Sequence, residues 1–281
     1  MFCGRGRRHC GKCGGSILAK NWIITAGHCC KDIAGLDREP GRMSVAVGAH
    51  HDDSCRYSNT CDVSPKINPN FIGTILKVRD VFTHDDYEAY DPDTNKRYIW
   101  DMCLLKVQKI PINSNTISAI SLSPIHVGDV QKNGNFQAEC FAVGWGVTES
   151  GWQSRILLET KINVINTGVC TNSTSEAYRS FDQKYNFCAG TTVGHDTCTG
   201  DSGGPLICLV NGVQVLYGII SFGPKDGTGP HARPLCGNKD GNSPGVYATV
   251  TNALDWIKSY VPGKKIKYIL DIFINQMMEF L

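Results

Sequence analysis

Cysteine content is the feature that most limits what this chain can be. Of its 281 residues, 14 are cysteines. A secreted protein pairs such residues as disulfides, whereas a cytosolic protein would have to use this many thiols as metal ligands or redox groups. The first residues, however, contain no apolar stretch of the kind that an export signal requires. The cysteines therefore indicate secretion, while the N-terminus carries no signal for it.

Two interpretations resolve this conflict. In the first, the sequence lacks its true beginning, and the export signal precedes Met1. In the second, the protein is cytosolic, and Cys10, Cys13 and residues 28–30 (His-Cys-Cys) form a zinc cluster. The motifs of the chain, taken together, favour the first interpretation.

Composition excludes several classes of protein. Lys and Arg number 28 against 26 Asp and Glu, and a net charge of +2 gives no electrostatic reason to expect a nucleic-acid partner. No uncharged apolar run approaches the ~18 residues of a membrane-spanning helix. Glycine and proline are frequent but follow no period, which excludes a collagen-like chain and low-complexity disorder.

Short apolar runs separated by Gly, Pro, Asn and Asp predict an all-β protein, built as a sandwich or barrel rather than from βαβ units. Helical periodicity occurs only near the end, over residues 252–260 and again over 264–281. The second stretch is amphipathic and could dock on its own domain, on a partner or on a membrane surface. The predicted strands are residues 17–18, 22–25, 43–47, 75–78, 104–107, 140–143, 157–162, 205–210, 213–222 and 246–250.

Three motifs carry residues suited to nucleophilic catalysis. Ser202 lies in Gly-Asp-Ser-Gly-Gly-Pro, where glycines permit a tight turn and backbone N–H groups can receive a developing oxyanion. His28 follows an apolar strand in Thr-Ala-Gly-His-Cys, and histidine is the usual base for a serine nucleophile. Asp101 opens an apolar strand, from which a buried carboxylate can orient an imidazole. Each motif alone has a structural explanation, but the three together are far more specific.

With these motifs, the chain resembles the chymotrypsin/trypsin family of serine proteases. The order His, Asp, Ser matches that family, as do the segments 13–16 (Cys-Gly-Gly-Ser), 144–146 (Gly-Trp-Gly), 187–190 (Phe-Cys-Ala-Gly) and 244–247 (Pro-Gly-Val-Tyr). The resemblance runs from about Cys13 to Tyr260. It implies two packed six-stranded antiparallel β-barrels with a C-terminal helix.

The resemblance also implies how the chain is divided. Residues 1–118 would form the N-terminal barrel, with an incomplete first strand because Met1 and Phe2 resemble only the end of that strand. Residues 119–262 would form the C-terminal barrel and its helix. Residues 263–281 would be an amphipathic helical tail. A polar stretch at residues 112–116 lies close to the expected boundary.

Catalytic roles follow from the resemblance residue by residue. His28 would act as general base and then general acid, Asp101 would orient it, and Ser202 would attack the scissile carbonyl to form an acyl-enzyme. The backbone N–H groups of Gly200 and Ser202 would form the oxyanion hole. Ser221 matches a serine that hydrogen-bonds the triad carboxylate; the alternative is an ordinary strand serine.

Substrate choice is expected to depend on Asp196. This residue matches the acid at the base of the specificity pocket in trypsin-like members, together with Ser221 and the small wall residues Gly223 and Gly245. A buried carboxylate needs a partner, and a substrate Arg or Lys would supply one. The resemblance thus implies cleavage of protein or peptide substrates after Arg or Lys. The alternatives are that Asp196 lies in a solvated turn or pairs internally, for example with Arg233.

Activation is expected to involve Asp201. In the family, cleavage frees an apolar N-terminus, usually Ile-Val-Gly-Gly, whose ammonium pairs with this aspartate. No such tetrapeptide occurs in the chain, and only 12 residues precede Cys13. We therefore expect the chain by itself to be zymogen-like and poorly active. The alternative function is a non-catalytic binding module with a protease fold.

The resemblance assigns eight of the cysteines to disulfides. A further bond between Cys30 and Cys103 is geometrically reasonable, because the triad must bring their segments together; the alternative is a buried free Cys103. Cys55 and Cys61 share an insertion and are expected to pair locally. The partners of Cys3 and Cys10 stay open. The implied pairs are Cys13–Cys29, Cys140–Cys208, Cys170–Cys188 and Cys198–Cys236.

The remaining expectations concern partners. The resemblance implies a secreted monomer without a membrane span, which acts without a cofactor and is open to protein protease inhibitors. Pro244 resembles members that lack a sodium site. The acidic residues Asp52, Asp53, Asp85 and Asp86 suggest calcium, but no ligand set can be matched, and solvated loops are favoured.

Overall fold

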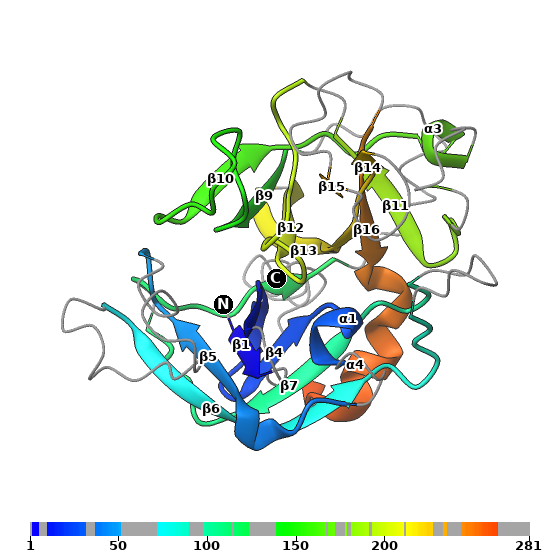
Figure 1. The fold of residues 1–281 in the computed structure, drawn as a ribbon. Coiled ribbons are helices and arrows are strands. Elements are labelled where there is room, and N and C mark those ends of the chain that lie inside the picture. Colours follow the sequence, from blue (N-terminus) through cyan, green and yellow to red (C-terminus); the bar gives the residue numbers. More distant parts are fainter. Residues whose placement is uncertain are drawn as a thin grey trace, which may run out of the picture.

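Two β-sheets, stacked as lower and upper lobes in Figure 1, make up most of the protein. The residues that this computed structural model describes are 2–5, 10–31, 37–51, 72–89, 98–113, 115–123, 139–166, 168–171, 178, 181–190, 193–210, 212–226, 233–234 and 243–263. Almost all strand pairs in both sheets are antiparallel, as a trypsin-like barrel architecture requires.

The first sheet has seven strands in the order β2-β1-β5-β6-β7-β4-β3. Strand β4, which pairs with β7, is buried along its whole length. The strands are β1 (Phe2–Arg5), β2 (Cys10–Cys13), β3 (Ser16–Ala19), β4 (Trp22–Thr25), β5 (Met43–Val47), β6 (Thr74–Thr83) and β7 (Cys103–Val107).

The second sheet also has seven strands, with β10-β9-β12-β13-β16-β11 in order and the short β8 added parallel to β13. A separate pair of two-residue strands, β14 (Lys225–Asp226) and β15 (Arg233–Pro234), follows β13. The main strands are β8 (Ser121–Leu122), β9 (Cys140–Gly144), β10 (Leu158–Lys161), β11 (Asn186–Ala189), β12 (Pro205–Val210), β13 (Val213–Phe222) and β16 (Gly245–Thr249).

Helices are few and short in the described part of the chain. They are α1 (Gly27–Cys30), α3 (Gly168–Thr171) and α4 (Leu254–Tyr260), with 3-10 turns at Pro40–Arg42 and Val250–Ala253. None of the described helices is long and apolar enough to cross a membrane.

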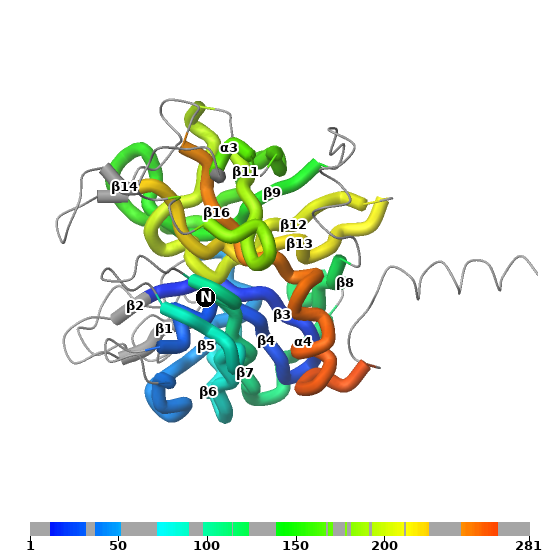
Figure 2. Tube along the Cα trace, turned by 90° about the vertical axis from the view of Figure 1, so that its right-hand side faces the viewer, coloured from blue at the N-terminus to red at the C-terminus, as the bar shows by residue number. Residues whose placement is uncertain are grey.

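One apolar cluster of the described residues extends across both lobes, and two further clusters lie within the second lobe. Leu104 of β7, Leu216 of β13 and Ile257 of α4 are fully buried and belong to the same cluster. Helix α4 follows the second sheet in sequence but packs against the lobe of the first sheet, as Figure 1 and the rotated view in Figure 2 both show. The candidate site described below lies where these lobes meet.

Every strand predicted from the sequence is present, and the helix expected at 252–260 begins as a 3-10 turn and continues as α4. Each sheet has seven strands where six were expected. Four strands of these sheets were not predicted, and all are short: β1, β2 and β11 have four residues each with Cys among them, and β8 has two residues. β1 extends the expected first-strand segment to Arg5. The predicted tail at 264–281 lies outside the described residues.

Candidate active site

Strand pairing brings His28 and Asp101 together although they are 73 residues apart in sequence. His28 lies in α1, directly after β4, and Asp101 lies two residues before β7. Because β4 and β7 are antiparallel neighbours with Thr25 opposite Cys103, the end of β4 and the start of β7 meet at one edge of the sheet. The sequence predicted this meeting from the motifs, and the sheet provides its geometry.

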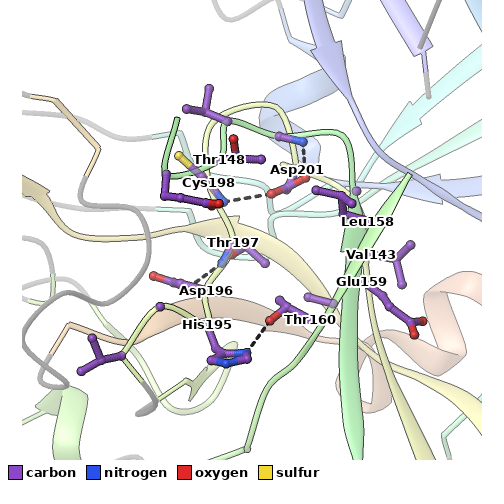
Figure 3. Close-up of a pocket in the computed structure, with 17 residues that line it drawn as sticks. Val143, Thr148, Leu158, Glu159, Thr160, His195, Asp196, Thr197, Cys198 and Asp201 are labelled. Atoms are coloured by element: carbon purple, nitrogen blue, oxygen red, sulfur yellow. Dashed lines mark hydrogen bonds between the residues drawn. The ribbon is translucent and has the colours of Figure 1, made fainter. Parts of the chain in front are cut away.

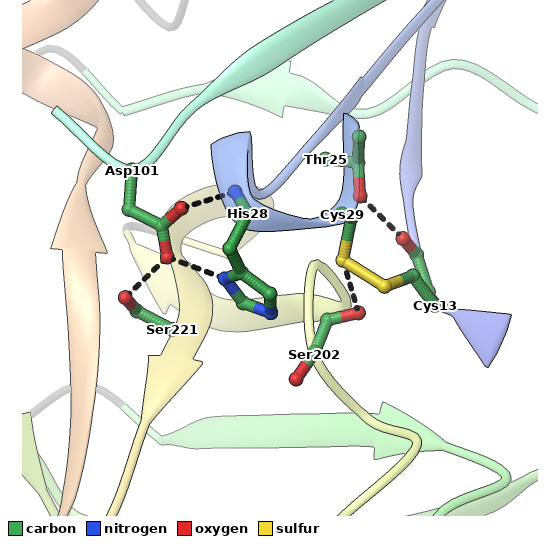
Figure 4. A network of polar contacts seen from close by, with 8 residues as sticks. Cys13, Thr25, His28, Cys29, Asp101, Ser202 and Ser221 are labelled. Carbon is green, nitrogen blue, oxygen red and sulfur yellow. Dashed lines mark hydrogen bonds and ion pairs between the residues drawn. A yellow bond between two sulfur atoms is a disulfide. The ribbon is translucent and has the colours of Figure 1, made fainter. Parts of the chain in front are cut away.

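Three hydrogen bonds hold the Asp101 carboxylate (Figure 4). His28 Nδ1 lies 2.8 Å from Oδ2, and the backbone N–H of His28 donates to Oδ1 at 2.8 Å. Ser221 Oγ, from the second sheet, donates to Oδ2 at 2.5 Å. The Asp101 side chain is fully buried, whereas that of His28 is 22% exposed. The carboxylate is therefore fixed in place while the imidazole keeps one edge toward solvent.

His28 and Asp101 shift each other's pKa. Burial lowers the pKa of His28, but attraction to Asp101 and the hydrogen bond between them outweigh burial, so the His28 pKa lies above its ordinary value. Burial raises the pKa of Asp101, but attraction to His28 and the hydrogen bonds from His28 and Ser221 bring it below its ordinary value. The pair therefore favours an ionised carboxylate and stabilises a protonated imidazole.

Ser202 lies beside the His28 ring, on the side away from Asp101 (Figure 4). Its carbonyl accepts a 2.8 Å hydrogen bond from the backbone N–H of Gly14 and lies 3.7 Å from Cys29 Sγ. The next residue, Gly203, has φ +77° and lies so close to Thr25 and Gly14 that a Cβ there would overlap them. The glycine after Ser202 is thus required by both its backbone conformation and the neighbouring chain.

Two backbone N–H groups beside Ser202 make no hydrogen bond to the described residues. Gly200 has φ +103°, and the N–H of Asp201 turns back to the carbonyl of Cys198 at 2.9 Å. Within the described part of the chain, the N–H groups of Gly200 and Ser202 have no acceptor. Two free donors next to a serine hydroxyl are the arrangement that acyl transfer uses to stabilise negative charge.

Asp196 lies against the backbone of the second sheet. Its carboxylate accepts a 2.7 Å hydrogen bond from the N–H of Thr197, and a Cβ on Gly245 would come within 3.2 Å of its Oδ1. Burial raises the pKa of Tyr247, and the nearby Asp196 charge raises it further. A Cβ on Gly223 would meet nothing within 4 Å, so that residue borders open space. Ser221, by contrast, directs its hydroxyl to Asp101.

Asp201 turns away from the triad and toward glycines of the second sheet. The N–H of Gly146 donates to its Oδ1 at 2.7 Å, and that of Cys198 donates to Oδ2 at 3.0 Å. A Cβ on Gly144 or Gly146 would overlap this carboxylate. Burial raises the Asp201 pKa, and the two backbone hydrogen bonds only partly oppose this. Among the residues with described side chains, no Lys, Arg or His forms an ion pair with it.

A pocket of about 550 Å³ adjoins Asp201 (Figure 3). The Asp201 carboxylate lies at one end, and the hydrogen-bonded pair Thr160 and His195 (2.9 Å) lies at the other. Apolar side chains, among them Leu158 and Val193, contribute to the lining. The lining also includes Asp196, Glu149 and Glu159, so the pocket combines several acidic groups with apolar side chains.

Disulfides brace these segments. The expected pairs Cys13–Cys29, Cys140–Cys208 and Cys170–Cys188 are present. Cys30 and Cys103 are also bonded, so the alternative of a free Cys103 is wrong; this bond joins α1 to β7 next to His28 and Asp101. Cys198 is disulfide-bonded as well. Its expected partner Cys236, the residues Cys55 and Cys61, and the side chains of Cys3 and Cys10 lie outside what the structure describes.

Three cysteines of the zinc cluster considered above are disulfide-bonded and so cannot bind zinc. Ligand atoms of Cys13, His28 and Cys29 lie within 4.8 Å of one another, but the two sulfur atoms are bonded to each other. Cys30 is bonded to Cys103. None of these cysteines offers the thiolate that zinc requires.

Aromatic residues near the triad were missed by sequence analysis. The ring of Tyr98 lies 5.3 Å from that of His28 and 5.4 Å from that of Phe222. Trp100, directly before Asp101, stacks on His84 at 4.3 Å. The only signal for Tyr98 and Trp100 in the sequence is their closeness to Asp101.

Comparisons with known proteins give matches over most of the chain. A family model described as Trypsin matches residues 5–257. The chain is 32% identical over 249 residues to an ovochymase of Halocynthia roretzi, covering 87% of this chain and 13% of that protein. It is 30% identical to the CLIP domain-containing serine protease B4 of Anopheles gambiae, covering 89% and 62%, and 27% identical to a tryptase of Mus musculus, covering 89% and 78%. The chain thus spans less than two thirds of the first two of these proteins.

Proposed function

Because this chain belongs to the trypsin family of serine proteases, we propose that it is an endopeptidase that cleaves after Arg or Lys. The observation that carries the proposal is the Asp101 carboxylate, which holds His28 Nδ1 at 2.8 Å, with Ser202 on the opposite side of the imidazole. Acyl transfer needs a base between a serine and an orienting carboxylate, and these side chains supply those groups.

The proposed reaction has two stages. His28 Nε2 takes the Ser202 hydroxyl proton as Oγ bonds to the scissile carbonyl carbon, and the N–H groups of Gly200 and Ser202 bind the resulting oxyanion. His28 then gives its proton to the leaving amine as the C–N bond breaks, which leaves an acyl-enzyme. In the second stage, His28 takes a proton from water as the water oxygen bonds to the acyl carbon. His28 then returns the proton to Ser202 Oγ as the ester bond breaks, and the peptide acid is released. Asp101 stays ionised throughout and stabilises the imidazolium.

Asp196 is the proposed specificity residue. Its carboxylate lies against Gly245 in a part of the molecule where small residues leave room for a long side chain. A substrate Arg or Lys would then form a charge-assisted hydrogen bond with it.

Asp201 is the proposed activation partner. Its buried carboxylate is bound by backbone N–H groups and borders a pocket lined in part by apolar side chains, which suits a terminal ammonium on an apolar residue. Such an ammonium would neutralise Asp201 beside the proposed oxyanion hole. The environment of Asp201 also supports the second candidate, a binding module in which no ammonium pairs with Asp201 and the oxyanion hole stays incomplete. The disulfides support secretion as the proposed location.

Peptide esters ending in Arg, Lys or Phe test this proposal on the purified chain, with and without the dipeptide Ile-Val as a source of an apolar ammonium. Hydrolysis of the Arg and Lys esters that is lost in Ser202→Ala supports a trypsin-like endopeptidase. Hydrolysis of the Phe ester alone refutes the role of Asp196. No hydrolysis under either condition favours the binding module.

A further inference from the structure

A stacked aromatic group lies behind the triad carboxylate. The rings of His84 and Trp100 are parallel within 3° at 4.3 Å, and Trp256 of α4 packs on the same histidine at 4.8 Å. Tyr185, next to β11 of the second sheet, meets Trp100 edge-on at 5.0 Å. The group thus connects both sheets and α4 to the residue that precedes Asp101.

Trp100 has an unfavourable backbone conformation. Its φ is +50°, in the left-handed region that bulky residues rarely adopt, and Tyr98 has φ +31°. The carbonyl of Trp100 accepts a 2.6 Å hydrogen bond from the N–H of Met102, which closes a tight turn with Asp101 at its centre. Such strain persists only where the surroundings over-determine the conformation. The direction of the Asp101 carboxylate therefore depends on what holds Trp100.

His84 is well placed to hold this turn. The residue is 8% exposed, and its backbone N–H donates to the carbonyl of Met102 at 3.0 Å. Its Nδ1 lies 3.2 Å from the backbone N–H of Asp86, from which it accepts a hydrogen bond, so this nitrogen is unprotonated and the proton is on Nε2. Both the position and the rotation of the ring are thereby fixed, and its face is presented to Trp100.

We propose that His84 is a positioning residue for the triad: its ring, stacked on Trp100, holds the left-handed turn that directs the Asp101 carboxylate at His28. His84 touches neither the substrate nor the reacting atoms, and it acts through Trp100. The effect on catalysis rests on the proposed function. The effect on the hydrogen bond between His28 and Asp101 does not, and it can be measured in a chain that turns over no substrate.

The His28 Nδ1–H proton provides the measurement, because a proton shared with a carboxylate gives a distinct downfield NMR resonance in a ¹⁵N-labelled chain. In His84→Ala we expect this proton to exchange with solvent about tenfold faster, because the strained turn loses its support. In His84→Phe, which keeps a flat ring against Trp100, we expect exchange close to that of the wild type.

Phe82→Ala is the matched control. Phe82 packs on Tyr260 at 4.7 Å and on Trp22 at 5.7 Å, so its loss removes an aromatic ring from the same side of the first sheet without a ring contact to Trp100. It is expected to lower the urea midpoint and leave the His28 resonance unchanged. Equal effects of His84→Ala and Phe82→Ala on the resonance would show that His84 is only a packing residue.

A second variant covers the case in which His84→Ala does not fold. Trp100→Leu keeps an apolar side chain but removes the stacking partner, and it should also speed exchange of the His28 proton. An unchanged resonance in a folded Trp100→Leu variant overturns the proposal. Wild-type protein that shows the resonance but hydrolyses no ester would count against the proposed function and leave the role of His84 intact.

Discussion

Ser221 reaches from the second sheet to Asp101 of the first and donates a 2.5 Å hydrogen bond to its carboxylate. The Asp101 carboxylate of one lobe is thereby fixed by a hydroxyl of the other, at the interface between the two sheets. Both groups are almost completely buried. A buried charge that loses a hydrogen bond has no water to replace it.

Ser221→Ala should therefore weaken the triad without unfolding the protein. Loss of a hydrogen bond to a buried charge is expected to raise the pKa of Asp101 and to lower kcat by about tenfold. NMR titration of His28 and steady-state kinetics on an Arg ester check this. Ser259→Ala, which removes an exposed hydroxyl from α4, is the control. A kcat equal to that of the control would contradict the role assigned to Ser221.

Stability should depend on pH through the pair formed by His28 and Asp101. The raised His28 pKa contributes stability that is fully present below the ordinary value of 6.5 and is lost as pH rises through the folded value. The lowered Asp101 pKa contributes stability that is present above the ordinary value of 3.8 and is lost as pH falls through the folded value. The pair's contribution is therefore largest between these two ordinary values.

Urea unfolding of the wild type and Asp101→Asn over a series of pH values measures that contribution. The difference between their midpoints should be greatest near pH 4 to 6, roughly, and decrease on either side. A difference that does not change with pH would mean that the pair is not ionised in the folded protein.

Asp196→Asn tests specificity while it preserves the shape of the side chain. Loss of the charge-assisted hydrogen bond to a substrate cation should lower kcat/KM for an Arg ester by about 10- to 100-fold. Reaction of Ser202 with a small fluorophosphonate should not change, since that probe has no basic side chain. Asp255→Asn, on the exposed face of α4, is the matched control. An unchanged kcat/KM for the Arg ester would mean that Asp196 does not bind the basic side chain of the substrate.

Gly203 and Gly212 form a natural comparison because their φ values are +77° and +78°. A Cβ on Gly212 would meet nothing within 4 Å, whereas one on Gly203 would overlap Thr25 and the backbone of Gly14. Gly212→Ala should thus cost about 1 to 2 kcal/mol from backbone strain alone. Gly203→Ala should cost about 3 kcal/mol or more, because overpacking adds to the strain. Equal urea midpoints would show that the chain around Ser202 is not closely packed.

Long apolar strands were predictable from the sequence, whereas short polar ones were not. β13 extends over ten residues with most side chains buried, and its apolar run is evident. β2, with the sequence Cys-Gly-Lys-Cys, exists because it pairs with β1, and no local pattern reveals it. The parallel β8 likewise depends on a tertiary contact with β13.

The candidate site divides in the same way. His28, Asp101 and Ser202 were predicted from motifs, because the chemistry requires particular residue types within short segments. The bond between Cys30 and Cys103 stayed open, since it depends on how α1 lies against β7. The stack of His84 on Trp100 had no signal at all, because the segments that carry these residues meet only when β6 pairs with β7.

Covalent labelling of Ser202 tests the central claim most directly. The purified chain should be treated with a fluorophosphonate, with and without Ile-Val, and the modified peptide identified by mass spectrometry. The account predicts one adduct, on Ser202, that requires His28 and is absent from His28→Ala and Ser202→Ala. No adduct under either condition, or equal labelling of Ser202 in His28→Ala, would contradict the assignment of a serine nucleophile activated by a histidine.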